Sequence, residues 1–156
     1  AAPAIGSAAL RLAMKKIDLT QFKSALFGEM VKRFDIEEEA DAFWKSMKTR
    51  VKLGPWFFET PRDLPIVIAS ASPEFELCHA AKILGVKNLI GTRADGATGQ
   101  LIGKNCKGAE KIERIREVIG EFEVRAMYTD DAKADAALLE IAKEPYIVTR
   151  GKVERQ

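Results

Sequence analysis

Three changes from strand to helix follow one another in the second half of this chain, and each places polar side chains beside an apolar run. The first is the run 66–69, which leads into the segment Ser70–Pro73. The second is the lysine-bearing helix start at 105–111, and the third is the run 124–128, which leads into the pair 130–131. Strands that alternate with helices predict an α/β domain with a mainly parallel sheet. Because ligands bind beyond the carboxyl ends of such strands, we expect these side chains to share one site.

Residues that begin or end helices mark the elements of this region. Pro73 suits the first turn of a helix, and Gly85 suits the C-terminal cap of the same helix. The apolar spacing of residues 109–119 predicts a helix that stops at Gly120. The same kinds of signal predict the other elements, which are strands at 88–91 and 146–148, a hairpin around 100–102 and a helix at 135–142.

The first third of the chain is predicted to be helical. Residues 20–34 place aromatic and aliphatic side chains on one stripe, and Asp35 offers an N-cap to a second helix that continues to Val51. Gly54-Pro55 ends that second helix. Mutual burial in a small helical bundle is the favoured interpretation of these stripes, and binding of a partner helix is the alternative.

Composition and charge exclude several classes of protein. Apolar residues make up 47% of the 156 residues and the net charge is +2, with no basic block of the kind that binds a nucleic-acid backbone. Cys78 and Cys106 lie at no metal-ligand spacing, so we expect a reduced, cytoplasmic setting with neither a disulfide framework nor a zinc site.

The apolar stretch 1–14 is interrupted by Arg11 and is too short to span a membrane. No basic segment precedes this stretch, as a signal peptide would require. Nothing in the sequence predicts an oligomeric state.

The segment after the first apolar run has two interpretations. In one, the Ser70 hydroxyl and the backbone N–H groups of Ala71 and Ser72 bind phosphoryl oxygens, because unpaired donors at a helix start favour an anion. In the other, Ser70 or Ser72 simply caps the helix that begins at Pro73. The serines taken alone favour capping.

Carboxylates and lysines supply the other candidate groups. Asp131 and Asp135 are four residues apart, so one helical turn would bring them to the same face, where they could hold Mg²⁺ together with a phosphate. The alternative is that the two aspartates are solvated and only cap a helix, but their position after a strand favours a role as metal ligands. Lys107 or Lys111 could reach a phosphate from the start of its helix. His79, within a predicted helix, is expected to be structural.

Three segments together resemble motifs II, III and IV of the haloacid dehalogenase superfamily, in residues 66–73, 105–112 and 128–139. The resemblance is greatest to the branch of phosphoserine phosphatase and phosphatidylglycerophosphatase-like proteins, and it extends from about residue 4 to the C-terminus. It implies a Rossmann-like core with a mainly parallel sheet and flanking helices in residues 59–156, and a small helical cap in residues 1–58. It also implies a magnesium-dependent phosphatase that hydrolyses a small phosphomonoester through an aspartyl-phosphate.

The resemblance also implies roles for individual residues. Ser70 resembles the motif II hydroxyl. Lys111 resembles the motif III lysine of the lipid-phosphatase-like members, whereas Lys107 resembles that of phosphoserine phosphatase, and Lys111 is favoured. Asp131 and Asp135 resemble the motif IV pair. The neighbouring Asp130 is an extra carboxylate where the family usually has Gly or Ser, so all three aspartates are candidate metal ligands.

The departure from the family concerns the nucleophile. The family uses the first Asp of an Asp-x-Asp motif on a central strand before the cap, and no such motif precedes residue 60. We therefore expect the chain to be N-terminally incomplete and inactive by itself. The absent strand would leave unpaired backbone groups in the middle of the sheet. A non-catalytic phosphate-binding or regulatory module is the alternative.

Overall fold

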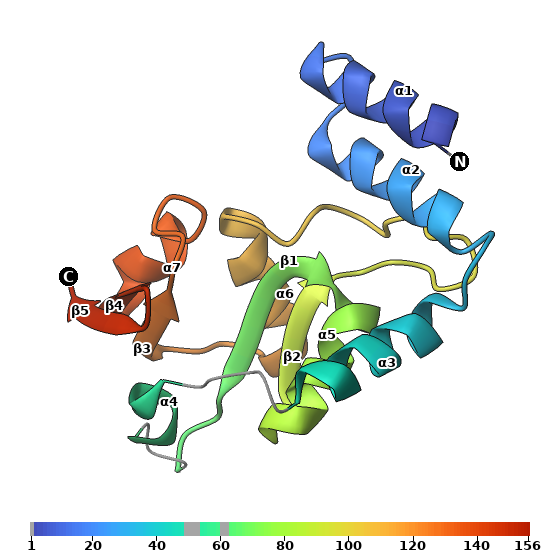
Figure 1. Ribbon diagram of the computed structural model, residues 1–156. Coiled ribbons are helices and arrows are strands. Elements are labelled where there is room, and N and C mark those ends of the chain that lie inside the picture. The colour runs from blue at the N-terminus through green and yellow to red at the C-terminus, as the bar shows by residue number, and fades with distance from the viewer. Residues whose placement is uncertain (1, 49–53, 60–62) are drawn as a thin grey trace.

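The computed structural model describes residues 2–48, 54–59 and 63–156. Helices fill the N-terminal part, and from residue 67 onward strands and helices alternate as expected for an α/β fold (Figure 1). The order of the elements along the chain is α1 (Ala2–Ala13), α2 (Leu19–Met30), α3 (Ile36–Met47), α4 (Pro55–Glu59), β1 (Val67–Pro73), α5 (Glu74–Leu84), β2 (Asn88–Thr92), α6 (Ala109–Ile119), β3 (Val124–Thr129), α7 (Ala136–Ile141), β4 (Ala142–Thr149) and β5 (Lys152–Arg155).

The N-terminal helices begin where side chains cap them. The Asp18 carboxylate accepts a hydrogen bond from the Gln21 backbone N–H (2.8 Å) and the Gln21 side chain accepts one from the Asp18 N–H, so a capping box starts α2. Asp35 caps α3 as predicted, because its carboxylate accepts from the N–H groups of residues 37 and 38. The first predicted helix ends at Met30, four residues early. The predicted end of the second helix, around Val51, lies outside the described residues.

The sheet is divided into two parts. β1 pairs in parallel with β2, from Val67 opposite Asn88 onward, and β3 pairs in parallel with β4. Within the described residues β1 and β3 have no strand on their other edges. In Figure 1 the two parts stand side by side, and α1 and α2 lie beyond the upper end of β1. The predicted α/β class with parallel strands is confirmed, with the sheet open between β1 and β3.

Two strands differ from the prediction. β1 continues through Ser70 to Pro73 instead of ending at residue 69, so the serines lie on the strand itself. β4 begins at residue 142 and is followed by an unpredicted antiparallel strand, β5. The connection is a tight hairpin in which Arg150 and Gly151 both have positive φ (51° and 82°), the backbone of a two-residue hairpin turn.

One apolar cluster joins the two parts of the sheet. Ile90 and Cys106 are 0% exposed, and Ile115 of α6 and Leu138 of α7 pack with them. Partly buried side chains from both β1 and β3 complete the cluster, namely Val67, Ala69, Val124 and Met127. A fully buried aliphatic side chain contributes about 1.5–3 kcal/mol, so helix α6 and its neighbours hold the two parts together across the open edge. In the described part of the chain no helix is long and apolar enough to span a bilayer.

Candidate functional site

An open cavity of about 310 Å³ lies between the carboxyl ends of β1 and β3. Both parts of the sheet and the start of α6 supply its walls. The residues that line it are Ala69, Ser70, Ala71, Lys107, Lys111, Tyr128, Thr129, Asp130, Asp131, Ala134 and Asp135. Of the residues predicted for the site, Ser72 alone does not line the cavity. The structure therefore brings the three predicted segments together, while the chemical roles of their residues remain predictions.

A buried ion pair forms the floor of the cavity. The Lys111 ammonium donates to Asp135 Oδ1, and the side chains of the two residues are only 8% and 7% exposed. The Thr129 hydroxyl donates to the other carboxylate oxygen of Asp135 (2.7 Å). Both oxygens of Asp135 are thus engaged, which favours a role in holding Lys111 over direct contact with a metal. Lys107, by contrast, is exposed at the rim.

The loop after β3 presents two exposed carboxylates. Asp131 accepts a hydrogen bond from the Ala134 N–H (2.9 Å), and its own N–H donates to the Thr129 hydroxyl (3.0 Å). Neither Asp130 nor Asp131 forms an ion pair with a described residue. Magnesium binds through one or two carboxylates together with phosphate oxygens and waters, and this pair fits that requirement. No group of three His, Cys, Asp or Glu side chains in the described ranges is placed to hold an ion.

The serine segment does not cap the following helix. Pro73 occupies the N-cap position of α5, and no side chain forms a cap hydrogen bond there, so the capping interpretation is wrong. Instead the Ser72 N–H donates to Ser70 Oγ (3.1 Å). That bond uses a lone pair of the Ser70 oxygen and leaves its proton available to an acceptor in the cavity. The Ser72 N–H was predicted to donate to a phosphate, but in the structure it is already bonded to Ser70.

Three residues that the sequence did not single out meet beside this segment. The Lys23 ammonium, from α2, donates to the Ala71 carbonyl (2.8 Å) and to Asn105 Oδ1 (2.9 Å). The buried Thr92 hydroxyl lies within hydrogen-bond distance of the same two oxygens (2.9 and 3.1 Å) and accepts from the Cys106 N–H (3.0 Å). These contacts join residues up to 82 positions apart. No spacing rule could have revealed them.

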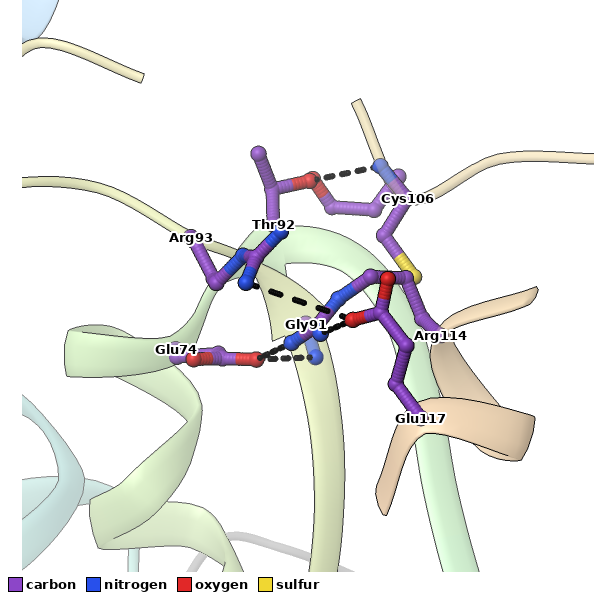
Figure 2. A network of polar contacts seen from close by, with 8 residues as sticks. Glu74, Gly91, Thr92, Arg93, Cys106, Arg114 and Glu117 are labelled. Carbon is purple, nitrogen blue, oxygen red and sulfur yellow. Dashed lines mark hydrogen bonds and ion pairs between the residues drawn. The ribbon is translucent and has the colours of Figure 1, made fainter. Parts of the chain in front are cut away.

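A charged network ties α5, β2 and α6 together (Figure 2). Arg114, whose side chain is 8% exposed, bonds Glu74 (2.8 Å) and Glu117. Burial opposes the charge of its guanidinium, but the bonds to both carboxylates outweigh burial and raise the pKa of Arg114. Glu74 also accepts from the Gly91 N–H (3.2 Å). A Cβ on Gly91 would lie 2.9 Å from the Ser72 carbonyl, so only glycine fits there.

An aromatic column lies along β3 and β4. Trp56 of α4 stacks on Tyr128 (centroids 4.5 Å apart, planes at 15°), and Tyr128 stacks on Tyr146 (4.8 Å, 8°). Tyr128 also lines the cavity. Trp56 therefore packs against an aromatic wall of the site.

His79 lies outside the cavity. Its Nδ1 is 3.1 Å from Asp41 Oδ1, so it joins α5 to α3. This contact agrees with the structural role predicted for it.

Comparison with known proteins places this site in context. The profile of haloacid dehalogenase-like hydrolases matches residues 3–140. Two curated relatives, each called Protein CicA and from two strains of Caulobacter vibrioides, are 36% identical over 125 residues, which cover 76% of this chain. The chain spans about 56% of the length of these relatives. A crystal structure of a protein with unknown function from Bordetella pertussis Tohama I has the same fold, with a TM-score of 0.68 and 20% identity, over 90% of this chain and 70% of that one.

Proposed function

The chain belongs to the haloacid dehalogenase-like hydrolase family, and on this premise we propose that the protein is a magnesium-dependent phosphatase that acts on a small phosphomonoester. The observation that carries the proposal is the cavity between β1 and β3, in which a hydroxyl, a buried lysine and exposed carboxylates converge. Phosphoryl transfer requires positive charge and donors around the phosphate oxygens, and a separate site for a metal. The converging groups meet both requirements.

Each side of the cavity has a distinct role in this proposal. The Ser70 hydroxyl donates to a phosphoryl oxygen. Lys111 offsets the charge of the phosphate, and Asp135 keeps its ammonium in place. Asp131, with Asp130 beside it, would hold magnesium, which when bound neutralises phosphoryl charge. Lys107 at the rim adds positive charge where the substrate enters.

The proposed reaction also needs a nucleophile. A carboxylate oxygen attacks phosphorus, the ester P–O bond breaks, and the leaving oxygen takes a proton; water then hydrolyses the acyl-phosphate. No Asp-x-Asp segment lies before residue 60, so we propose that a segment outside residues 1–156 supplies this carboxylate. In the part of the chain that the structure describes, β1 and β3 each have an edge with no neighbouring strand. These edges support the assignment, because a strand inserted there would bring its end to the cavity. Residues 1–156 by themselves are then inactive. We propose the reduced setting of the cytoplasm for the protein.

The missing nucleophile favours one other candidate, a non-catalytic module that binds phosphate. Such a module would use Ser70 and Lys111 in the same way but would have no turnover. It predicts that inorganic phosphate binds to the protein in calorimetry while p-nitrophenyl phosphate stays intact.

The decisive experiment uses protein expressed from its whole coding sequence. We expect magnesium-dependent hydrolysis of p-nitrophenyl phosphate, and Asp131→Ala should lower kcat/KM by about 100-fold or more because the metal loses its main ligand. Glu154→Ala removes an exposed carboxylate on β5, away from the cavity, and serves as the matched control with unchanged rate. Full activity in Asp131→Ala would reject the metal assignment. Magnesium-dependent turnover by residues 1–156 alone would reject the need for an outside nucleophile.

A further inference from the structure

We propose that Lys23, on the N-terminal helix α2, is a positioning residue for the cavity, because it fixes the peptide unit that orients the Ser70 hydroxyl. This inference deepens the proposed function, since the ligand of that hydroxyl is taken to be a phosphate. Lys23 does not line the cavity, and it acts through the Ala71 carbonyl.

The Ala71 carbonyl is held by two elements that are far apart in the sequence. Lys23 donates to it from α2 (2.8 Å), and the Thr92 hydroxyl lies 2.9 Å from it at the end of β2. Lys23 also donates to Asn105 Oδ1 (2.9 Å), on the loop that precedes α6. A single ammonium therefore ties α2 to the serine segment and to the segment that carries Lys107.

The orientation of this carbonyl determines the direction of the next N–H group. The peptide unit between Ala71 and Ser72 is planar and trans, so its C=O and its N–H point in opposite directions. With the carbonyl directed at Lys23 and Thr92, the Ser72 N–H is directed at Ser70 Oγ, to which it donates (3.1 Å). Because the Ser70 oxygen accepts that bond, its proton is the part left for a ligand, and no described residue accepts it.

Helix α2 is seated on the core by contacts that do not involve Lys23. Ser24 Oγ accepts from the Leu101 N–H (3.1 Å), and Phe27 packs edge-on against Phe75 of α5 with ring centroids 5.6 Å apart. Gly28 and Gly99 approach so closely that a Cβ on Gly99 would lie 2.5 Å from the Gly28 nitrogen. Loss of the Lys23 ammonium should therefore leave α2 in place and release only the Ala71 carbonyl and Asn105.

The positive charge of Lys23 costs free energy because the side chain is partly buried, and an apolar side chain that only filled the space would avoid this cost. Partial burial, with Lys107 nearby, lowers the pKa of Lys23 in spite of the opposing charge of Glu76. A methionine at position 23 would fill similar space without that cost. The gain from the ammonium is then the two hydrogen bonds, which fits a role in orienting the serine segment.

The test compares Lys23→Met with Lys32→Met in protein expressed from its whole coding sequence. Lys32 lies two residues after the end of α2, but its side chain is 68% exposed and bonds only Glu29 among the described residues. Hydrogen exchange of the Ser72 amide, followed by NMR, reports the bond to Ser70 without any reference to activity. Titration with inorganic phosphate and steady-state kinetics with p-nitrophenyl phosphate report how well the Ser70 hydroxyl binds a phosphoryl oxygen.

We expect Lys23→Met to speed exchange of the Ser72 amide and to weaken phosphate binding, each by about five- to tenfold, the size of one hydrogen bond. KM should rise more than kcat falls, and Lys23→Arg, which keeps donors at that position, should restore most of the loss. Lys32→Met should change none of these values. Unchanged Ser72 exchange in a folded Lys23→Met protein would overturn the inference. If Lys23→Met does not fold, Lys23→Gln takes its place in the same comparison.

The outcomes also separate this inference from the proposed function. Faster Ser72 exchange in a protein that binds no phosphate would support Lys23 as the positioning residue and would reject the phosphatase proposal. Normal Ser72 exchange in Lys23→Met, combined with strong phosphatase activity of the wild type, would support the phosphatase proposal and would reject Lys23 as the positioning residue.

Discussion

The cavity has two halves that are built in different ways. The β3 half, which comprises Lys111 and residues 128–135, is held mainly by its own loop. Asp131 bonds Ala134, Thr129 bonds both Asp131 and Asp135, and Lys111 of α6 bonds Asp135. The β1 half, which comprises residues 69–72, depends on distant donors, namely Lys23 and Thr92. One half is thus a local structure locked by a buried ion pair, while the other is assembled by the rest of the molecule.

The largest expected effect concerns the ion pair of the β3 half. Lys111→Met keeps the length of the side chain but leaves the Asp135 carboxylate buried without its cation. Breaking one partner of a buried pair costs about 3–5 kcal/mol, and the loss should appear in urea unfolding of the variant. Lys143→Met is the matched control, because its side chain and that of its partner Glu123 are 66% and 79% exposed, so solvent screens the pair and its loss should change stability little. Equal losses in the two variants would show that the β3 half is not locked in this way.

The next effect concerns the close approach that supports the β1 half. Gly91→Ala would place a Cβ 2.8 Å from Glu74 Cγ and 2.9 Å from the Ser72 carbonyl, so the serine segment must shift. We expect a loss of about 1–3 kcal/mol in the free energy of unfolding, together with weaker binding of inorganic phosphate. Gly96→Ala, whose Cβ would meet nothing closer than 3.6 Å, should change neither quantity appreciably. A stable Gly91→Ala protein with normal phosphate binding would contradict the dependence of the β1 half on its surroundings.

The smallest effect is a pH dependence that separates two lysines of the N-terminal helices. Burial lowers the pKa of Lys23 below its ordinary value of 10.5, so the unfolded chain binds that proton more tightly and stability rises with pH between the folded pKa and 10.5. The bond to Asp41 raises the pKa of the exposed Lys45, so its contribution is complete below 10.5 and is lost as pH rises through the folded pKa. The stability difference between wild type and Lys23→Met should therefore increase with pH, and that between wild type and Lys45→Met should decrease. Urea midpoints measured from about pH 9 to pH 11 test both signs. If the two stability differences changed with pH in the same direction, burial would not disfavour the charged form of Lys23.

The same contrast explains what could be predicted from the sequence. Asp131 and Asp135 are separated by one turn of chain after a strand, so their placement beside each other follows from local geometry. The helix 109–119 and its stop at Gly120 follow from apolar spacing and a glycine, and both are confirmed. Local rules therefore predicted where the two aspartates and the helix lie, but not the bonds from Lys111 and Thr129 to Asp135.

The β1 half could not be predicted because its determinants are not local. The segment Ser70–Pro73 carries typical capping residues, yet it forms part of β1. Its register with β2 is irregular between Ala69 and Pro73, and the bonds from Lys23 and Thr92 to the Ala71 carbonyl outweigh the local preference. Lys23 is one of many lysines, and its partners lie 48 and 82 positions away. The hairpin that creates β5 was also missed, although Arg150-Gly151 is a weak signal for a tight turn.

The aromatic column gives the molecule an optical label of its own. Trp56 rests on Tyr128, a wall of the cavity, whereas the other tryptophan, Trp44, belongs to α3. Indole emission is sensitive to the rings and charges around it. Entry of a ligand that moves the Tyr128 ring will therefore alter the fluorescence of Trp56, and occupancy can be followed without a dye.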